Sequence, residues 1–328
     1  MNIRTESTDK PPPREYRQEV TDDIIRLLEE GTAPWQKPRE SGQAGRIPYN
    51  PTTNKPYRGG NVLSLMTSGM RKGYSDPRWM TYKQASDQGW QVRKGEKATR
   101  IEFWETAGGS KEKDAEADED GKRPRLIHRV YSIFNAQQID GIPPLHLEPH
   151  KSFEVIEAGE RILANSGAEI RHGGDRAFYT RSGDYIHLPE KEQFVDAPAY
   201  YATGCHELVH WTGAGHRLNR DTLTKSRGFN AADEHYAREE LIAEIGSMML
   251  AAETGLPHDP SQHAAYVASW LAALKKDKNE IFRAASAANK ATDYVLNIDR
   301  AVEPEHDIED SHAAHLAASR ADRQLALF

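Results

Sequence analysis

Apolar residues recur at helical spacing in some stretches of this chain and alternate at strand spacing in others. The apolar repeat between Glu15 and Gly31 predicts one helix, and a second is predicted from Gly60 to about Lys72. Strands are predicted in the stretches WMTYK, WQVRKGEKATRIEFWE and RLIHRVYSIFNAQQ, which are separated by glycine-containing turns. This first part of the chain is therefore expected to be of the α+β class.

A second pattern follows the proline-containing stretch PPLHLEPHK at 143–151, which is predicted to be a linker. It begins with the helical sequence FEVIEAGERILANSG, continues with three short strands, and ends in helices that include 234–254 and 261–298. Since 328 residues favour two domains, we expect α+β domains at 14–142 and 151–300 and a flexible tail at 301–328. The charged segment 107–124 is predicted to be a disordered insertion in the first domain.

Composition excludes several classes of protein. The single cysteine, Cys205, excludes internal disulfides and zinc modules built from several cysteines. No stretch approaches the roughly 18 apolar residues of a membrane span, and the first residues lack the apolar core of a secretory signal. A cytoplasmic protein without a membrane partner is expected. The net charge of −7 means that any nucleic-acid binding must come from a local patch.

The sequence HELVHWTGAGH at 206–216 predicts a metal site. On a helix, His206 and His210 lie four residues apart on one face and can direct both imidazoles at one ion. Glu207 is then placed to act as the general base of a metal-assisted hydrolysis. The expected ion is Zn²⁺, and the same ligands would accept Mn²⁺.

The third ligand has more than one candidate. Gly213 and His216 complete the longer pattern HExxHxxGxxH, in which the glycine lets the chain turn and a third histidine reach the ion. The rival is Glu240 in the apolar helical stretch EELIAEIGSMML, where a buried carboxylate is costly without a partner. The residues favour Glu240 over His216, with Glu239 as a less favoured substitute. Glu244, one turn later, is expected to hydrogen-bond a ligand histidine from outside.

A peptidase also needs a strand that holds an extended substrate beside the ion. The segment DYIHLP at 184–189, just before the histidine helix, is a candidate for such an edge strand and equally for an ordinary core strand.

The first domain contains a local concentration of positive charge and aromatic rings. Between positions 46 and 104 there are eleven basic residues against four acidic ones, interleaved with tyrosine, tryptophan and phenylalanine. Cations that follow phosphates and rings that stack on bases suit unpaired, single-stranded DNA. About half of the rings are expected to form the domain core, with Phe103 the foremost core candidate, and Asn61 is also a candidate helix cap. The predicted DNA contacts are Tyr57, Arg58, Asn61, Lys83, Arg93, Lys94 and Lys97.

These motifs together resemble the ArdC antirestriction family. The C-terminal resemblance is carried by HELVHWTG, RLNR and EELIAEIGSMML. The N-terminal resemblance is carried by APWQKP, IPYNPTTNKPYRGGNVLSL, WMTYKQASDQGWQVRKGEKATRIEFW and VYSIFNAQQIDG, so that residues 14–298 are covered. The resemblance implies an N-terminal domain that binds single-stranded DNA and a zincin-like metallopeptidase domain whose metal set is two histidines and a later glutamate. It also implies protection of incoming plasmid or phage DNA against host restriction.

The last residues, QLALF at 324–328, leave large apolar side chains at the end of a polar tail. They resemble the short peptides that dock bacterial replication proteins on the DNA sliding clamp, with Gln324, Leu325, Leu327 and Phe328 as the contacts. The alternative is a tail that folds back on its own domain.

Two functions of different classes are consistent with these patterns. The first is an antirestriction protein that binds single-stranded DNA and hydrolyses a protein or peptide substrate at the metal site formed by His206, His210 and Glu240, with Glu207 as the base. The second is a non-enzymatic protein that coats single-stranded DNA and uses the metal only to brace the second domain.

Overall fold

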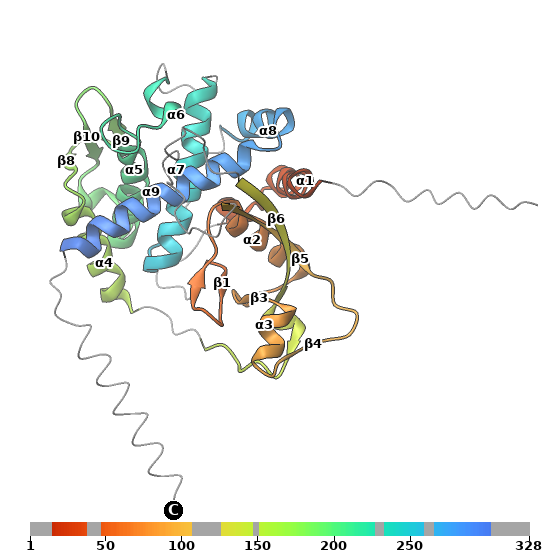
Figure 1. Cartoon of the computed structure of the whole chain (residues 1–328). Helices are drawn as coiled ribbons and strands as arrows, with labels where there is room; N and C mark the ends of the chain where they lie inside the picture. The colour runs from red at the N-terminus through yellow and green to blue at the C-terminus, as the bar shows by residue number, and fades with distance from the viewer. Residues whose placement is uncertain are drawn as a thin grey trace, which may run out of the picture.

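The computed structural model describes residues 15–37, 47–106, 126–146, 151–226, 233–258 and 266–302 (Figure 1). We refer to residues 15–146 as the N-terminal unit and to residues 151–302 as the C-terminal unit. The predicted α+β class is confirmed, with strands and helices in both units. The predicted insertion at 107–124 and the QLALF peptide lie outside the described residues.

The N-terminal unit is built around a small antiparallel sheet. Its strand order is β3-β6-β5, and the long hairpin of β5 and β6 pairs Thr99 with Ile133 at one end. Helix α2 packs against β5 and helix α3 against β3. The main elements are α1 (Tyr16–Glu29), the 3-10 turn η1 (Pro34–Gln36), α2 (Gly60–Lys72), β3 (Trp79–Thr81), α3 (Tyr82–Asp87), β5 (Thr99–Thr106) and β6 (Leu126–Asn135). Short pairs are made by β1 (Tyr49–Asn50) with β2 (Lys55–Pro56) and by β4 (Gln91–Val92) with β7 (Ile139–Asp140).

The C-terminal unit packs a second small sheet beside a group of helices. Helix α5 contacts α4, α7 and α9, and α9 also packs extensively against α7 (Figure 1). The elements are α4 (Ser152–Asn165), β8 (Glu169–His172), β9 (Phe178–Thr180), β10 (Tyr185–Leu188), α5 (Ala197–Thr212), α6 (Asp221–Thr224), α7 (Glu234–Thr254), α8 (Val267–Lys276) and α9 (Glu280–Val302).

Local signals set the ends of the two helices that matter most for the site. Helix α5 begins after Asp196, whose side chain accepts a hydrogen bond from the backbone N–H of Ala199 at 2.8 Å. Helix α7 ends at Gly255, where a left-handed backbone with φ of 77° lets the chain turn away. The predicted limits of 60–72 for α2 and 234–254 for α7 agree with the structure.

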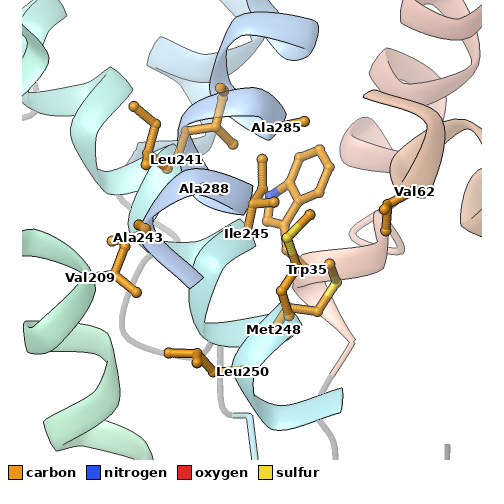
Figure 2. Packing of buried hydrophobic residues seen from close by; sticks show 14 of the residues in the cluster. Trp35, Val62, Val209, Leu241, Ala243, Ile245, Met248, Leu250, Ala285 and Ala288 are labelled. Carbon is orange, nitrogen blue, oxygen red and sulfur yellow. The ribbon is translucent and has the colours of Figure 1, made fainter. Parts of the chain in front are cut away.

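One hydrophobic core runs through both units. Trp35, in the N-terminal unit, is fully buried and packs against α2 and α7, close to Val62, Ile245 and Met248 (Figure 2). Helix α1 packs on α8, and α2 packs on α9. The added Cβ of an alanine at Gly60 would come within 2.3 Å of the Phe282 ring, so the glycine permits the close approach of α2 to α9. The two units are therefore joined by buried contacts rather than by a linker alone.

The structure selects one of two alternatives for β10 and contradicts one expectation for Phe103. The strand β10 was a candidate either for an edge strand or for an ordinary core strand, and it lies in the middle of its described sheet, in the order β8-β10-β9, which agrees with the core alternative. Its Ile186 and Leu188 are fully buried on one face of the sheet, and the strand pairs with β8 on one side and β9 on the other. Phe103 was expected in the core but is 42% exposed, with its ring edge-on to Tyr131. It lies toward the far end of β5, beyond the buried Ile101.

Candidate metal centre and DNA-binding surface

Helix α5 places His206 and His210 side by side, with ring centroids 5.0 Å apart. The neighbouring helix α7 directs the carboxylate of Glu240 at both rings. The Nε2 atom of His206 lies 3.7 Å from Glu240 Oε2, and the Nε2 atom of His210 lies 3.6 Å from Glu240 Oε1. One ligand atom from each of the three residues can be chosen so that all lie within 4.8 Å of one another. This spacing is suited to a single cation held between the two helices.

The opposite nitrogens of the two rings are held from outside. His210 Nδ1 lies 3.3 Å from Glu239 Oε1, and His206 Nδ1 lies 3.2 Å from Ser247 Oγ. A carboxylate at Nδ1 favours a proton on that nitrogen, so that Nε2 of His210 is the atom available to an ion. Both rings thus present Nε2 toward the same point, as histidines do when they bind a metal.

Glu239 forms a buried ion pair with Arg220 and is not one of the three residues of the metal cluster. It is fully buried, and the guanidinium of Arg220 donates from Nε at 3.1 Å while Thr222 Oγ1 donates at 2.5 Å. Burial opposes ionisation of Glu239, but Arg220 and His210 outweigh it and hold the pKa at about 2. With its oxygens taken by these donors, Glu239 serves as an outer partner of His210.

The remaining electrostatics favour a cation. Burial opposes protonation of His210, yet the carboxylates of Glu240, Glu239 and Glu207 outweigh it and raise the pKa to about 9. Burial likewise opposes ionisation of Glu240, and the two histidines reverse the effect and lower its pKa to about 2. A negative field that attracts a proton also attracts a divalent cation, so the donor set of two imidazoles and one carboxylate fits Zn²⁺ or Mn²⁺.

His216 lies away from this cluster. Its side chain is 64% exposed, and its Nε2 atom lies 3.2 Å from Asp184 Oδ2. Gly213 does not turn the chain toward the ion either, because its φ of −78° is right-handed. Instead, a Cβ at Gly213 would come within 2.6 Å of Arg220 Nη2. The glycine leaves room for Arg220, which also donates to the carbonyl of Val209 at 2.6 Å near the end of α5.

Glu244 is placed one step further from the rings than expected. Its Oε1 atom is 3.9 Å from His206 Nδ1, which is longer than a hydrogen bond. On its other side, Oε2 lies 3.6 Å from His258 Nε2. Ser247 takes the hydrogen-bonding position beside His206 that was predicted for Glu244.

Glu207 and Tyr236 adjoin the cluster. Glu207 is buried on α5 between the two histidines in sequence, and its charge raises the pKa of His210. The hydroxyl of Tyr236 hydrogen-bonds Glu240, and burial raises the pKa of Tyr236 above its usual value. Tyr236 also lines a cavity of about 590 Å³ together with Tyr179 and Thr180 of β9, Asp184 and His216. Cys205 is fully buried on α5, which fits a packing residue, and burial raises its pKa to about 12.

Sequence reasoning missed Tyr236, Ser247, Arg220 and His258. Tyr236 could have been found, because it precedes Glu240 by four residues and so shares its helix face. Arg220 is the final residue of the RLNR stretch, and a lone arginine there has no spacing that predicts a buried partner. His258 and Ser247 reach the cluster only through the tertiary fold.

Two of the predicted DNA contacts are buried inside the N-terminal unit. Tyr57 is buried and donates to the carbonyl of Trp79 at 2.9 Å. Asn61 is also buried, and its side chain exchanges two hydrogen bonds with the backbone of Glu102, at 2.7 and 3.0 Å. The expectation that these two residues contact DNA conflicts with their burial, since side chains bonded inside the domain cannot reach a strand outside. Asn61 is not a helix cap either, because α2 begins after Gly59 without a side-chain cap.

The other candidates are exposed, and several form ion pairs. Arg58 pairs with Asp293 of α9, Lys83 pairs with Asp87 at 2.8 Å, and Arg93 pairs with Glu96 at 2.9 Å. The side chains of Lys94 and Lys97 are exposed. Among the described aromatic side chains of the N-terminal unit, Phe103 is 42% exposed and Tyr82 is 52% exposed. The structure thus leaves five of the predicted cationic contacts exposed, and of the two rings Phe103 was expected in the core.

Comparisons with known proteins agree with both units. Residues 14–135 match the N-terminal domain of the anti-restriction factor ArdC, and residues 157–287 match the zincin-like metallopeptidase family. The chain is 49% identical to the DNA primase TraC of Escherichia coli over 297 residues and 46% identical to a second TraC over 304 residues. It spans 27% and 20% of the length of those two relatives.

Further matches cover their relatives almost completely. The uncharacterized protein y4eC of Sinorhizobium fredii is 39% identical over 295 residues, which are 88% of this chain and 94% of y4eC. Crystal structures of the antirestriction protein ArdC from plasmid R388, metal-free and Mn(II)-bound, superpose with a TM-score of 0.70 at 38% and 40% identity. These matches cover 89% and 88% of this chain and the whole of the solved chains.

Among the helices of the described residues, none has the length and apolar character needed to cross a membrane. The order of the two matched domains and the full coverage of the R388 structures agree with the resemblance found in the motifs. The chain therefore belongs to the ArdC antirestriction family, with that family's N-terminal domain followed by a zincin-like metallopeptidase domain.

Proposed function

We propose that this protein binds single-stranded DNA through its N-terminal unit and hydrolyses a protein or peptide substrate at a metal site in its C-terminal unit. In this proposal the protein protects incoming mobile DNA from host restriction. The domain limits of 14–142 and 151–300, a cytoplasmic location and docking on the sliding clamp through residues 324–328 belong to the same proposal.

The observation that carries the proposal is the convergence of His206, His210 and Glu240 from two helices, with Nε2 of both rings facing one carboxylate. A cluster of hydrogen-bonded core residues would not need both Nδ1 atoms held from outside by Ser247 and Glu239. An ion bound by three protein ligands would keep room for a water and a substrate carbonyl, as catalytic zinc sites do.

The residues around the cluster would then perform the chemistry of peptide hydrolysis. When bound, a divalent cation supplies Lewis-acid polarisation of a carbonyl and lowers the pKa of a water. Glu207 takes the proton from the attacking water as general base and can pass it to the leaving amine. Tyr236, already hydrogen-bonded to Glu240, holds that carboxylate in place at the border of the cavity.

The cavity beside Tyr236 supports a site for an extended substrate. It is lined by Tyr179 and Thr180, which belong to β9 at one end of the described sheet. An outer strand can add a peptide by backbone hydrogen bonding, whereas the central β10 cannot. We therefore assign the substrate-holding strand to β9 in place of β10.

The N-terminal unit would hold the DNA strand by charge and stacking. Lys94 and Lys97 are exposed, Arg58, Lys83 and Arg93 are accessible although ion-paired, and Phe103 and Tyr82 present rings to solvent. Lysine and arginine side chains can follow phosphates while rings stack on bases of any sequence.

The test of the hydrolase proposal is Glu207→Gln. The substitution keeps the size of the side chain and removes the base, so we expect unchanged Mn²⁺ binding by calorimetry and loss of proteolysis by a factor of roughly 10² to 10⁴. Glu234→Gln, the same change at an exposed glutamate in the first turn of α7, is the matched control and should leave both measurements unchanged. Equal peptidase activity in Glu207→Gln and the unaltered protein would contradict the proposal.

A second function, a non-enzymatic coat on single-stranded DNA, is favoured by one feature. The buried network of Arg220, Glu239 and His210 ties α6, α7 and α5 together, as a bracing site would. Under that function, Glu207→Gln would leave protection of transferred DNA intact in a conjugation assay, and His210→Ala would abolish it by loosening the fold.

A further inference from the structure

The metal cluster is connected to the N-terminal unit by a line of buried polar contacts. Trp35, in the turn η1 of the N-terminal unit, is fully buried against α7 and α2 (Figure 2). Its backbone carbonyl accepts a hydrogen bond from His258 Nε2 at 2.7 Å. His258 itself is 5% exposed and lies just beyond the end of α7. A residue of the C-terminal unit therefore forms a direct hydrogen bond to the turn η1 of the N-terminal unit.

The same nitrogen of His258 faces the metal cluster through Glu244. His258 Nε2 is 3.6 Å from Glu244 Oε2, and the other carboxylate oxygen is 3.9 Å from His206 Nδ1. Because Nε2 donates to the carbonyl of Trp35, it carries the proton and turns a positive edge toward the carboxylate. Glu244 is 1% exposed, and the N–H edge of His258 is one of the polar groups that face its carboxyl group inside the protein.

Helix α7 carries both the proposed metal ligand Glu240 and the residues that contact Trp35 and His258. Glu240 and Glu244 lie four residues apart on one face of that helix, and Ile245 and Met248 of the same helix lie near Trp35. A displacement of the Trp35 turn would thus act on Glu244 directly and on the helix that carries Glu240. It would also change the field at His206, on the side opposite the ion-binding nitrogen.

We propose that His258 is a positioning residue that couples the docking of the N-terminal unit, at Trp35, to the orientation of Glu244 and so of the metal-binding His206. The proposal rests on the metal site of the proposed function. The N-terminal unit then contributes to the metal centre, although none of its residues belongs to the cluster. By reciprocity, metal binding would strengthen the docking of the two units.

The test is the Mn²⁺ affinity of the full chain, measured by calorimetry after removal of metal with a chelator. His258→Leu removes the donor, and we expect the affinity to fall by about 10- to 100-fold, as is usual when an outer partner of a ligand histidine is lost. His258→Gln keeps an N–H donor within reach of the same carbonyl and should recover most of the affinity. Circular dichroism and the melting temperature of each metal-free variant establish that the comparison is made between folded proteins.

His187→Leu is the matched control. His187 also donates to a backbone carbonyl, that of Arg176, from Nδ1 at 3.1 Å, and it stacks on Phe178. A merely structural loss of a histidine hydrogen bond would affect stability in both leucine variants, whereas the proposal expects a loss of Mn²⁺ affinity only in His258→Leu.

A double-variant cycle tests the route through Glu244. If His258 acts through that carboxylate, His258→Leu in a Glu244→Gln background should lower the Mn²⁺ affinity by less than about 2-fold further. Unchanged affinity in His258→Leu, or an independent and fully additive loss in the double variant, would overturn the proposal. Absence of Mn²⁺ binding to the unaltered chain would instead overturn the proposed metal site, and this inference with it.

Discussion

Glu239, Glu240 and Glu244 of the C-terminal unit are almost completely buried, whereas Lys83, Lys94 and Lys97 of the N-terminal unit are exposed. The buried carboxylates each face specific cationic or hydrogen-bonding groups, since an ionised group inside a protein is stable only with such partners. The exposed lysines are solvated and bear no comparable constraint on their position. A functional charge in an apolar helix can therefore be identified from the sequence, because its apolar neighbours indicate that it is buried. A functional charge on the surface cannot be identified in this way, because most charged residues are exposed.

The aromatic residues of the N-terminal unit also show that exposure could not be inferred from the sequence. Tyr57 was predicted to contact DNA and is buried, while Phe103 was predicted to be buried and is exposed. Nothing in the local sequence distinguishes the two, because both occur among cations and apolar residues. Their positions depend on how α2 and the β5–β6 hairpin pack.

The largest expected effect comes from removing the partner of a buried carboxylate. Arg220→Met leaves Glu239 buried without its guanidinium partner, and we expect the free energy of unfolding to fall by about 3–5 kcal/mol in urea denaturation. Arg171→Met provides the control, because Arg171 and Glu169 form an exposed pair whose loss should change the free energy of unfolding far less. Equal losses in the two variants would mean that burial of the Arg220 pair does not matter.

The effect of added metal on the melting temperature compares a buried glutamate of α7 with an exposed one. At an ion concentration about 100 times the dissociation constant, Mn²⁺ or Zn²⁺ should stabilise the unaltered chain by about 2.7 kcal/mol, seen as a rise in melting temperature. Glu240→Gln should abolish that rise because a carboxylate facing both imidazoles is lost. Glu234→Gln, in the exposed first turn of the same helix, should retain it. The same rise in both variants would remove Glu240 from the ligand set.

The smallest expected effects separate the two aromatic residues of the N-terminal unit. Phe103→Ala should weaken binding of an oligothymidylate by about 1–3 kcal/mol, if the exposed ring stacks on a base, with little change in stability. Tyr57→Phe removes a buried hydrogen bond to Trp79 and should lower stability by about 1 kcal/mol without affecting DNA affinity. Fluorescence anisotropy and urea denaturation measure the two quantities, and the reverse pattern would restore the original assignment of both residues.

The secondary structure was predictable wherever local signals were strong. Helix α2 was predicted close to its observed limits from its apolar periodicity, and the structure shows that Gly73, in a left-handed conformation, ends it. The strand β10 was found in sequence but not its place in the sheet, since an alternating pattern identifies one buried face and not the number of neighbours. The role of Gly213 was missed for a related reason, because only the fold brings Arg220 against it.

The sequence by itself determined the pair of histidines, the candidate base and the unusual carboxylates of α7, because helical periodicity places residues four apart on one face and burial makes a charge in an apolar helix conspicuous. It also determined the domain order. Only the tertiary structure decided that Glu240 faces both rings, that Glu239 is taken by Arg220, and that Trp35 meets His258 from the other unit. These contacts join residues far apart in the chain, and their distances depend on how helices pack rather than on any local pattern.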